Sequence, residues 1–235
     1  WKRRKDQSMA FEKRLGVFVK VPEPGTVKTR LVPPLNAEEA CRLYTAFLDD
    51  LFARVGRLRR VRGTVFYSGE SPDKLTDVIP HGYNVYPQRG GSLGERLQSA
   101  FQTLLEGDNR LALIIGSDSP DIPIQYVKRA FLKLKHKDVV LGPACDGGYY
   151  MVGLKSPVPE LFDDIDWGGQ TVFEQTLERI YQSRLTLSIM PLWYDVDTSA
   201  SLSLLATMIR ARRIERSGRL PATEAVLAEI LASGS

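Results

Sequence analysis

Cysteine and histidine are scarce in this sequence, with two residues of each type among 235. Cys41 and Cys145 are isolated in the chain, which predicts free thiols in a reducing compartment and no disulfide framework. Because thiols and imidazoles do not cluster anywhere, a zinc site is not expected. Any metal ion bound here must therefore be held mainly by carboxylates and phosphates.

Long apolar runs are also missing, and none approaches the roughly 20 residues that cross a bilayer. The first residues, WKRRKDQS, carry charges with no apolar segment behind them, so no signal peptide is predicted. We interpret residues 1–8 as a disordered or appended lead and residues 9–235 as a single domain. A cytoplasmic protein without a membrane span is the expectation.

Basic charge is concentrated at the amino terminus. The formal net charge is +4, and residues 2–6 contribute +3 of it, which leaves the remaining chain near +1. A second basic cluster, at 210–219, is typical of one solvated helix face. Charge runs alone are a weak sign of nucleic-acid binding, so no nucleic-acid partner is expected.

Strand-like and helix-like segments alternate along most of the chain, which favours an α/β sandwich of three layers with a mainly parallel, mixed sheet. Strands are expected at 15–20, 61–68, 83–87, 111–116, 139–142, 149–154 and 185–192. Helices are expected at 36–55, 92–107, 124–135, 170–183, 200–213 and 221–232. Asn36 is a good N-cap, and Ser92 with Glu95 has the spacing of a capping box.

The unusual loops follow strands, and in such sheets ligands bind at the carboxyl ends of the strands. The first loop contains KVPEPGTVKTR, from Lys20 to Arg30. A Walker loop needs two glycines before its lysine, and only Gly25 is present, while two prolines remove amide donors. We expect a phosphate site made of side chains, with Lys20, Lys28 and Arg30; a solvated connection is the alternative.

Two later loops supply carboxylates. Asp118, in SDSPD, follows an apolar strand and has no local structural role, so we expect it to hold a divalent ion at phosphates. Asp121 precedes Pro123 and a helix, so helix capping is its expected role. In YDVDT, Asp195 and Asp197 are two residues apart and point the same way if extended. Asp118 and Asp197 are the preferred metal ligands, with Asp195 as a third candidate.

The remaining loops leave alternatives open. In ACDGG, Asp146 precedes Gly147 and Gly148, which suits either close approach to a substrate or a tight turn between two strands. Arg96, beside Gly90 and Gly91, contacts a nucleotide or belongs to a strand-to-helix turn. Trp167 lines an acceptor pocket or packs in the interior.

Taken together, six segments resemble a family of GT-A-type nucleotide-diphospho-sugar transferases, formerly described as a domain of unknown function. They are KVPEPGTVKTRL, LGERL, GSDSPDIP, VVLGPACDGGYYMVGL, LFDDIDWGGQTV and WYDVDT, and they span residues 15–205 in order. The chain is also similar to guanylyl- and cytidylyltransferases. The resemblance implies a nucleotide or nucleotide-sugar ligand with Mg²⁺ or Mn²⁺, a basic loop on the phosphates, and metal ligands at Asp118 and Asp197.

We therefore expect a metal-dependent transferase with a nucleotide-diphospho-sugar donor, in which Asp146 orients the sugar or the acceptor. A nucleotidyltransferase that uses a nucleoside triphosphate and releases pyrophosphate is the first alternative, and a non-catalytic nucleotide-binding protein is the second. Ser117-Asp118-Ser119 stands where many glycosyltransferases of this fold have Asp-x-Asp, which leaves the reaction type open. The sequence specifies neither the acceptor nor the oligomeric state.

Overall fold

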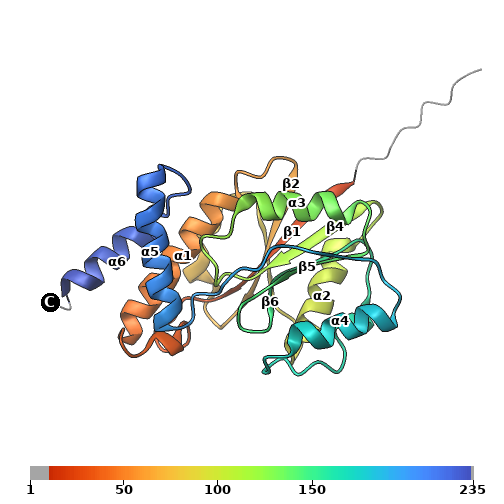
Figure 1. The fold of residues 1–235 in the computed structure, drawn as a ribbon, viewed down its shortest axis with the longest axis horizontal. Helices are drawn as coiled ribbons and strands as arrows, with labels where there is room; N and C mark the ends of the chain where they lie inside the picture. The colour runs from red at the N-terminus through yellow and green to blue at the C-terminus, as the bar shows by residue number, and fades with distance from the viewer. Residues whose placement is uncertain (1–10, 234–235) are drawn as a thin grey trace, which may run out of the picture.

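The computed structural model describes residues 11–233 and forms one mixed sheet with helices on both faces (Figure 1). The strands are β1 (Glu12–Lys20), β2 (Val61–Ser68), β3 (Asn84–Pro87), β4 (Arg110–Ile115), β5 (Val139–Pro143), β6 (Tyr149–Leu154) and β7 (Leu187–Ile189). The helices are α1 (Ala37–Val55), α2 (Leu93–Leu105), α3 (Ile124–Leu134), α4 (Val172–Gln182), α5 (Ser199–Glu215) and α6 (Pro221–Ser233). Short 3₁₀ turns occur at η1 (Thr29–Leu31), η2 (Pro72–Leu75) and η3 (Pro159–Phe162).

The sheet has seven strands in the order β3-β2-β1-β4-β6-β5-β7. All neighbouring pairs are parallel except those of β6, which runs antiparallel to β4 and to β5. The carboxyl ends of β1, β4 and β5 therefore meet at the same edge, and β6 begins at that edge. The loops that the sequence singles out leave from this edge.

Alternation along β1 divides the core into two halves. Leu15, Val17 and Val19 pack with α1 and α3 on one face, while Phe18 packs with α2 on the other. In Figure 1, α5 and α6 lie beside α1 at one end of the molecule, and α2 and α4 lie toward the other end. The predicted three-layer sandwich with a mainly parallel, mixed sheet is confirmed.

Local signals placed most elements well. Asn36 is the N-cap of α1, as predicted, and forms a capping box with Glu39; Ser92 and Glu95 form the predicted capping box of α2. The strands at 61–68 and 149–154 have the predicted bounds. The strand expected at 185–192 is too long, because only Leu187–Ile189 pairs with β5.

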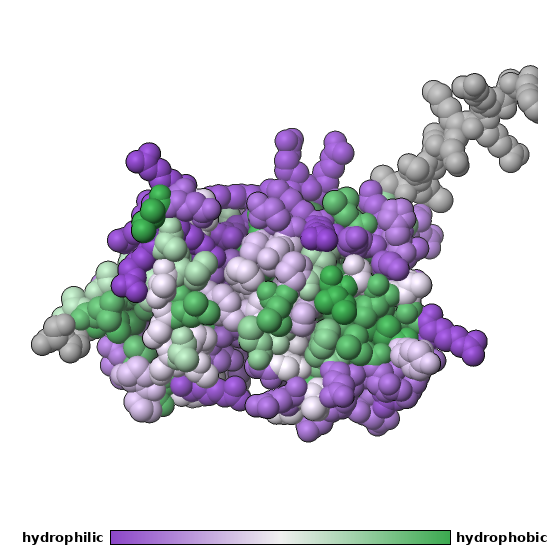
Figure 2. All heavy atoms as spheres, in the orientation of Figure 1, coloured by the Kyte–Doolittle hydropathy of each residue, from purple (hydrophilic) through white to green (hydrophobic). Residues whose placement is uncertain are grey.

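The surface combines a hydrophilic rim with apolar areas. Figure 2 shows apolar side chains over the centre and right of this face, with hydrophilic side chains along its upper rim. At the edge strand β7, Ile189 is 55% exposed.

Within residues 11–233, no helix is long and apolar enough to span a bilayer. The predicted lead at residues 1–8 lies outside the described residues, and the single domain at 9–235 stays a prediction.

Candidate active site

The centre of the candidate site is the ammonium group of Lys28, which lies between two carboxylates. Its Nζ donates to Oδ1 of Asp118 at 2.5 Å and to Oδ1 of Asp197 at 2.8 Å. The Lys28 side chain is only 2% exposed, whereas the side chains of Asp118 and Asp197 are 45% and 36% exposed. The structure therefore brings together three of the predicted site residues, from the loops after β1, after β4 and before α5.

The backbone and two aromatic rings hold Lys28 in this place. Lys28 has a left-handed backbone (φ 52°) at the start of η1, and its Nζ lies 5.8 Å and 5.5 Å from the ring centroids of Tyr44 and Phe47 on α1. Burial alone would lower the pKa of Lys28, but the charges of Asp118 and Asp197 outweigh it and raise that pKa above its usual value. The ammonium therefore stays charged in a buried position.

Tyr44 connects the ends of β1 and β4 beneath this pair. Its hydroxyl accepts from the Lys20 backbone N–H at 2.9 Å and lies 2.8 Å from the Ser117 hydroxyl. Burial raises the pKa of Tyr44 well above its usual range, so the hydroxyl stays neutral. The sequence did not point to Tyr44, because its place in the amphipathic pattern of α1 marks only a core position.

Asp195 lies beside the pair in a more enclosed setting. Its Oδ1 accepts from the Ser119 hydroxyl at 2.6 Å. Burial raises the pKa of Asp195 to about 7; the hydrogen bond from Ser119 acts against this rise, while the charges of Asp118, Asp146 and Asp197 add to it. Burial and the charges of the neighbouring aspartates thus both disfavour the ionised form of Asp195.

Asp121 does not cap α3, so that prediction is wrong. The residue at the start of α3 is Pro123, with no side-chain cap. The Asp121 carboxylate is instead fully buried and accepts from three side chains: Trp193 Nε1 at 3.2 Å, the Tyr194 hydroxyl at 2.7 Å and Arg212 Nη2 at 2.7 Å. A partner distant in sequence, Arg212 on α5, attracts the carboxylate more strongly than the exposed end of a helix does.

The loop between β5 and β6 carries Asp146 at its exposed tip. Its Oδ1 accepts from the Gly148 backbone N–H at 3.0 Å. Gly147 has φ +93°, and a Cβ there would overlap the carbonyl oxygen of Gln170. Phe173 N also donates to the Gly147 carbonyl at 2.9 Å. Gly147 thus allows close packing against the start of α4, within the turn that joins β5 to β6.

The other predicted site residues fall into exposed and structural positions. Lys20, Gly25 and Arg30 are exposed around the loop that leads to Lys28. Arg96 donates to the carbonyl oxygens of Gly90 at 3.1 Å and Gly91 at 3.4 Å, so it braces that turn.

Trp167 is partly buried and packs beside Tyr149 and Phe162, at ring-centroid distances of 6.2 Å and 6.3 Å. These contacts show packing, and the role in an acceptor pocket stays a prediction.

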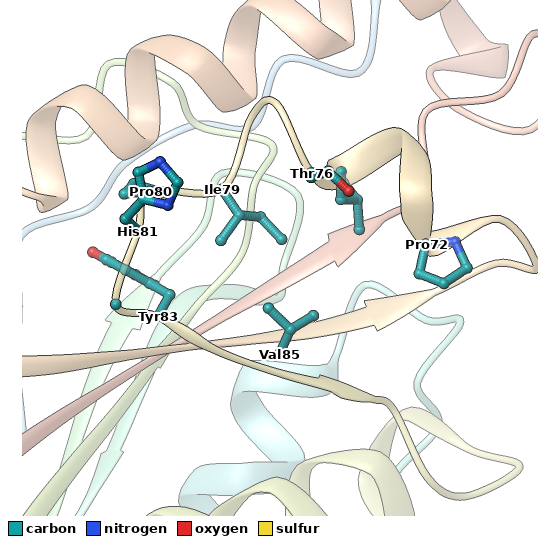
Figure 3. A pocket seen from close by; sticks show the side chains of 9 residues that line it. Pro72, Thr76, Ile79, Pro80, His81, Tyr83 and Val85 are labelled. Atoms are coloured by element: carbon teal, nitrogen blue, oxygen red, sulfur yellow. The ribbon is translucent and has the colours of Figure 1, made fainter.

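A cavity of about 340 Å³ lies elsewhere, between η2, β3 and the segment that joins them (Figure 3). Figure 3 shows Ile79, Tyr83 and Val85 among its lining side chains. None of the predicted site residues lines it. The Lys28 cluster is therefore an open arrangement at the sheet edge, separate from this mostly apolar hollow.

The carboxylates suit a divalent ion of the kind that the family resemblance implies. Asp118 and Asp197 both direct an oxygen at one cation, and both are partly open to solvent. Mg²⁺ is usually bound by one or two carboxylates together with phosphate oxygens and water. Within residues 11–233, no three His, Cys, Asp or Glu side chains are grouped as ligands of a metal ion. The pair thus fits an ion that is shared with a phosphate ligand.

Comparison with solved structures defines the class of fold. A protein of Desulfovibrio desulfuricans G20, whose name assigns it provisionally to the nucleotide-diphospho-sugar transferases, is 35% identical; the match has a TM-score of 0.85 and covers 94% of this chain and 96% of that chain. The fold of this protein is accordingly that of the nucleotide-diphospho-sugar transferases.

The family follows from the sequence match. The family described as "Uncharacterized protein conserved in bacteria (DUF2064)" matches residues 51–169. The chain belongs to this family. No curated protein matches it.

Two more distant structures share the fold alone. The 4-diphosphocytidyl-2C-methyl-D-erythritol synthase of Anaerococcus prevotii DSM 20548 is 7% identical with a TM-score of 0.56, over 85% of this chain and 97% of that one. A CMP:2-keto-3-deoxy-manno-octonic acid synthetase complexed with CTP is 10% identical with a TM-score of 0.51, over 86% and 99%.

Proposed function

We propose that this protein is a metal-dependent transferase that uses a nucleotide-diphospho-sugar donor. The observation that carries the proposal is the convergence of Asp118 and Asp197, from two different loops, on one cation position at the carboxyl edge of the sheet. Ligands of open α/β sheets bind at this edge. The provisional name of the 35% identical protein agrees with this assignment.

Each residue of the site has a role in this proposal. Asp118 and Asp197 would hold Mg²⁺ or Mn²⁺, and the bound ion supplies Lewis-acid stabilisation of charge on the diphosphate. Lys20 and Arg30 are exposed on the same loop system and would contact phosphate oxygens. Asp146, exposed at the tip of its turn, would orient the sugar or the acceptor. Asp195, beside the pair and bonded to the Ser119 hydroxyl, would be a third ligand candidate for the ion.

Lys28 has a more specific task than a general phosphate contact. Its ammonium is buried and shared by the two proposed metal ligands, so it is fixed at the place where negative charge collects. A preorganised cation of this kind stabilises charge that develops on a departing nucleotide, since little reorganisation is needed.

The proposal is tested by ligand-induced thermal stabilisation. Nucleotide sugars are added with and without Mn²⁺, and a ligand that binds only the folded protein raises the melting temperature. We expect a shift that needs both the nucleotide sugar and the metal, and that Asp118→Asn removes. Asp108→Asn, an exposed carboxylate ahead of β4, is the matched control and should keep the shift. Absence of a shift with every nucleotide would contradict the proposal.

Nucleotidyl transfer is the second candidate. The basic residues Lys20, Lys28 and Arg30 suit a triphosphate as well as a diphosphate, and the two distant fold relatives are named for cytidylyl products or bind CTP. Product analysis separates the two reactions. A glycosyl transfer releases a nucleoside diphosphate, whereas a nucleotidyl transfer from a triphosphate releases pyrophosphate. Binding with neither product would favour a non-catalytic nucleotide-binding protein.

A further inference from the structure

The Lys28 ammonium lies between Asp118 and Asp197, the two carboxylates proposed to hold a divalent ion. One oxygen of each carboxylate is within hydrogen-bond distance of Nζ, at 2.5 Å and 2.8 Å. Asp118 and Asp197 are also the two carboxylates proposed as metal ligands. The protein thus places a cation of its own on the two carboxylates.

The cation is held firmly, while the carboxylates stay accessible. Lys28 starts from a left-handed backbone position, and its Nζ lies near the faces of Tyr44 and Phe47. Its side chain is 2% exposed, against 45% for Asp118 and 36% for Asp197. Solvent, and anything dissolved in it, reaches the pair from the carboxylate side.

Charge makes the two cations compete. With Lys28 in place, the group of three side chains carries one net negative charge, and an added divalent ion would lie close to an ammonium in a partly buried setting. Repulsion between like charges is strong where water is largely excluded. Mg²⁺ also gives up its water reluctantly and prefers to share anionic phosphate ligands.

We infer that Lys28 acts as a built-in cation that keeps divalent metal off Asp118 and Asp197 until a phosphate-bearing ligand arrives. The arriving phosphates give the ammonium a new anionic partner and complete the oxygen ligands of the metal. Metal and nucleotide would then bind together rather than in sequence. The purpose of this device rests on the proposed function, but the competition itself requires only the three side chains.

The test measures Mn²⁺ binding without any nucleotide, from the electron paramagnetic resonance signal of free Mn²⁺. Four proteins are compared: wild type, Lys28→Met, the double variant Lys28→Met with Asp118→Asn, and Lys128→Met. We expect Lys28→Met to bind one Mn²⁺ at least about tenfold more tightly than wild type, because the competing charge is gone. The double variant should lose this gain. Lys128→Met removes the same charge from an exposed position on α3, outside the proposed site, and should bind like wild type.

Two results would overturn the inference: equal Mn²⁺ affinity in wild type and Lys28→Met, or a gain that survives the loss of Asp118. If Lys28→Met does not fold, Lys28→Gln takes its place, since its amide still donates to a carboxylate and its charge is gone. The outcomes are independent of the proposed function. If Lys28→Met binds Mn²⁺ more tightly but the wild-type protein binds no nucleotide sugar, the inference is upheld and the proposed function is refuted. If the wild-type protein binds a nucleotide sugar with metal but Lys28→Met shows no higher Mn²⁺ affinity, the proposed function is upheld and the inference is refuted.

Discussion

Asp118 and Asp121 lie three residues apart along the chain and belong to two different ion-pair clusters. The two clusters are built in opposite ways. At Asp118 the cation is buried and the carboxylate is 45% exposed. At Asp121 the carboxylate is 0% exposed, and its partner Arg212 is 11% exposed. In the first cluster the open member is the one that can bind a ligand; in the second, three donors already occupy the carboxylate.

This difference separates a binding arrangement from a structural one. Asp121 ties α5 and the residues at 193–194 to the loop after β4, so its hydrogen bonds connect three segments distant in sequence. Asp118 connects the loop after β1 to the same loop, but one side of its carboxylate faces solvent. Exposure of the acidic member, rather than the presence of an ion pair, distinguishes the candidate site.

The largest effect is expected at the closed cluster. Asp121→Ala removes a buried charge and leaves Arg212, Tyr194 and Trp193 without their acceptor, so the free energy of unfolding should fall by about 3–5 kcal/mol. Urea unfolding followed by tryptophan fluorescence measures it. Asp118→Ala is the matched control and should cost clearly less, because Lys28 keeps Asp197. Equal losses in the two variants would abolish the distinction between the clusters.

A second effect concerns the turn that carries Asp146. Gly147→Ala places a Cβ against the Gln170 carbonyl at a backbone φ of +93°, so we expect a loss of roughly 1–3 kcal/mol in unfolding free energy. Gly25→Ala is the control, since Gly25 has φ +81° but open space where a Cβ would lie. It should lose less. If Gly25→Ala loses as much as Gly147→Ala, backbone strain alone explains the effect and close packing at Gly147 does not.

A smaller loss is expected at the open cluster. Lys28→Met keeps the packing against Tyr44 and Phe47 and leaves two carboxylates that water can solvate, so unfolding free energy should fall by only about 1–2 kcal/mol. Thermal and urea unfolding give this value. A loss as large as that of Asp121→Ala would show that the pair with Lys28 is a structural cluster of the closed kind.

The smallest loss of unfolding free energy is expected at Asp138, a surface carboxylate outside both clusters. Hydrogen bonds from the Thr186 hydroxyl and backbone lower the pKa of Asp138 below its usual value of 3.8. Because the folded pKa is depressed, this stabilisation is present above pH 3.8 and is lost as the pH falls through the folded pKa. Asp138→Asn should cost less than about 1 kcal/mol at pH 7, since solvent screens the interaction, and almost nothing near pH 2.

Urea unfolding at both pH values checks this, with the exposed Asp77→Asn as control. A loss that does not change with pH would assign the effect to hydrogen-bond geometry instead of charge.

The elements predicted best were those whose signals are local. The N-cap at Asn36, the capping box at Ser92 and the apolar run of β4 depend on neighbours within a few residues, and each appears where the pattern placed it. The role of Asp121 was predicted wrongly because its partners are distant in sequence. Its partner Arg212 is 91 residues away, and no spacing in the sequence marks that pair.

By itself, the sequence determined the layered α/β fold and the edge at which the unusual loops gather, because alternation of strands and helices allows few other arrangements. It also indicated Lys28, Asp118 and Asp197 as members of a site. Only the tertiary structure decided that Lys28 lies buried between the two carboxylates, and that Asp121 belongs to the interior. Both results depend on which charges come together when distant segments pack, and on how much water remains beside them.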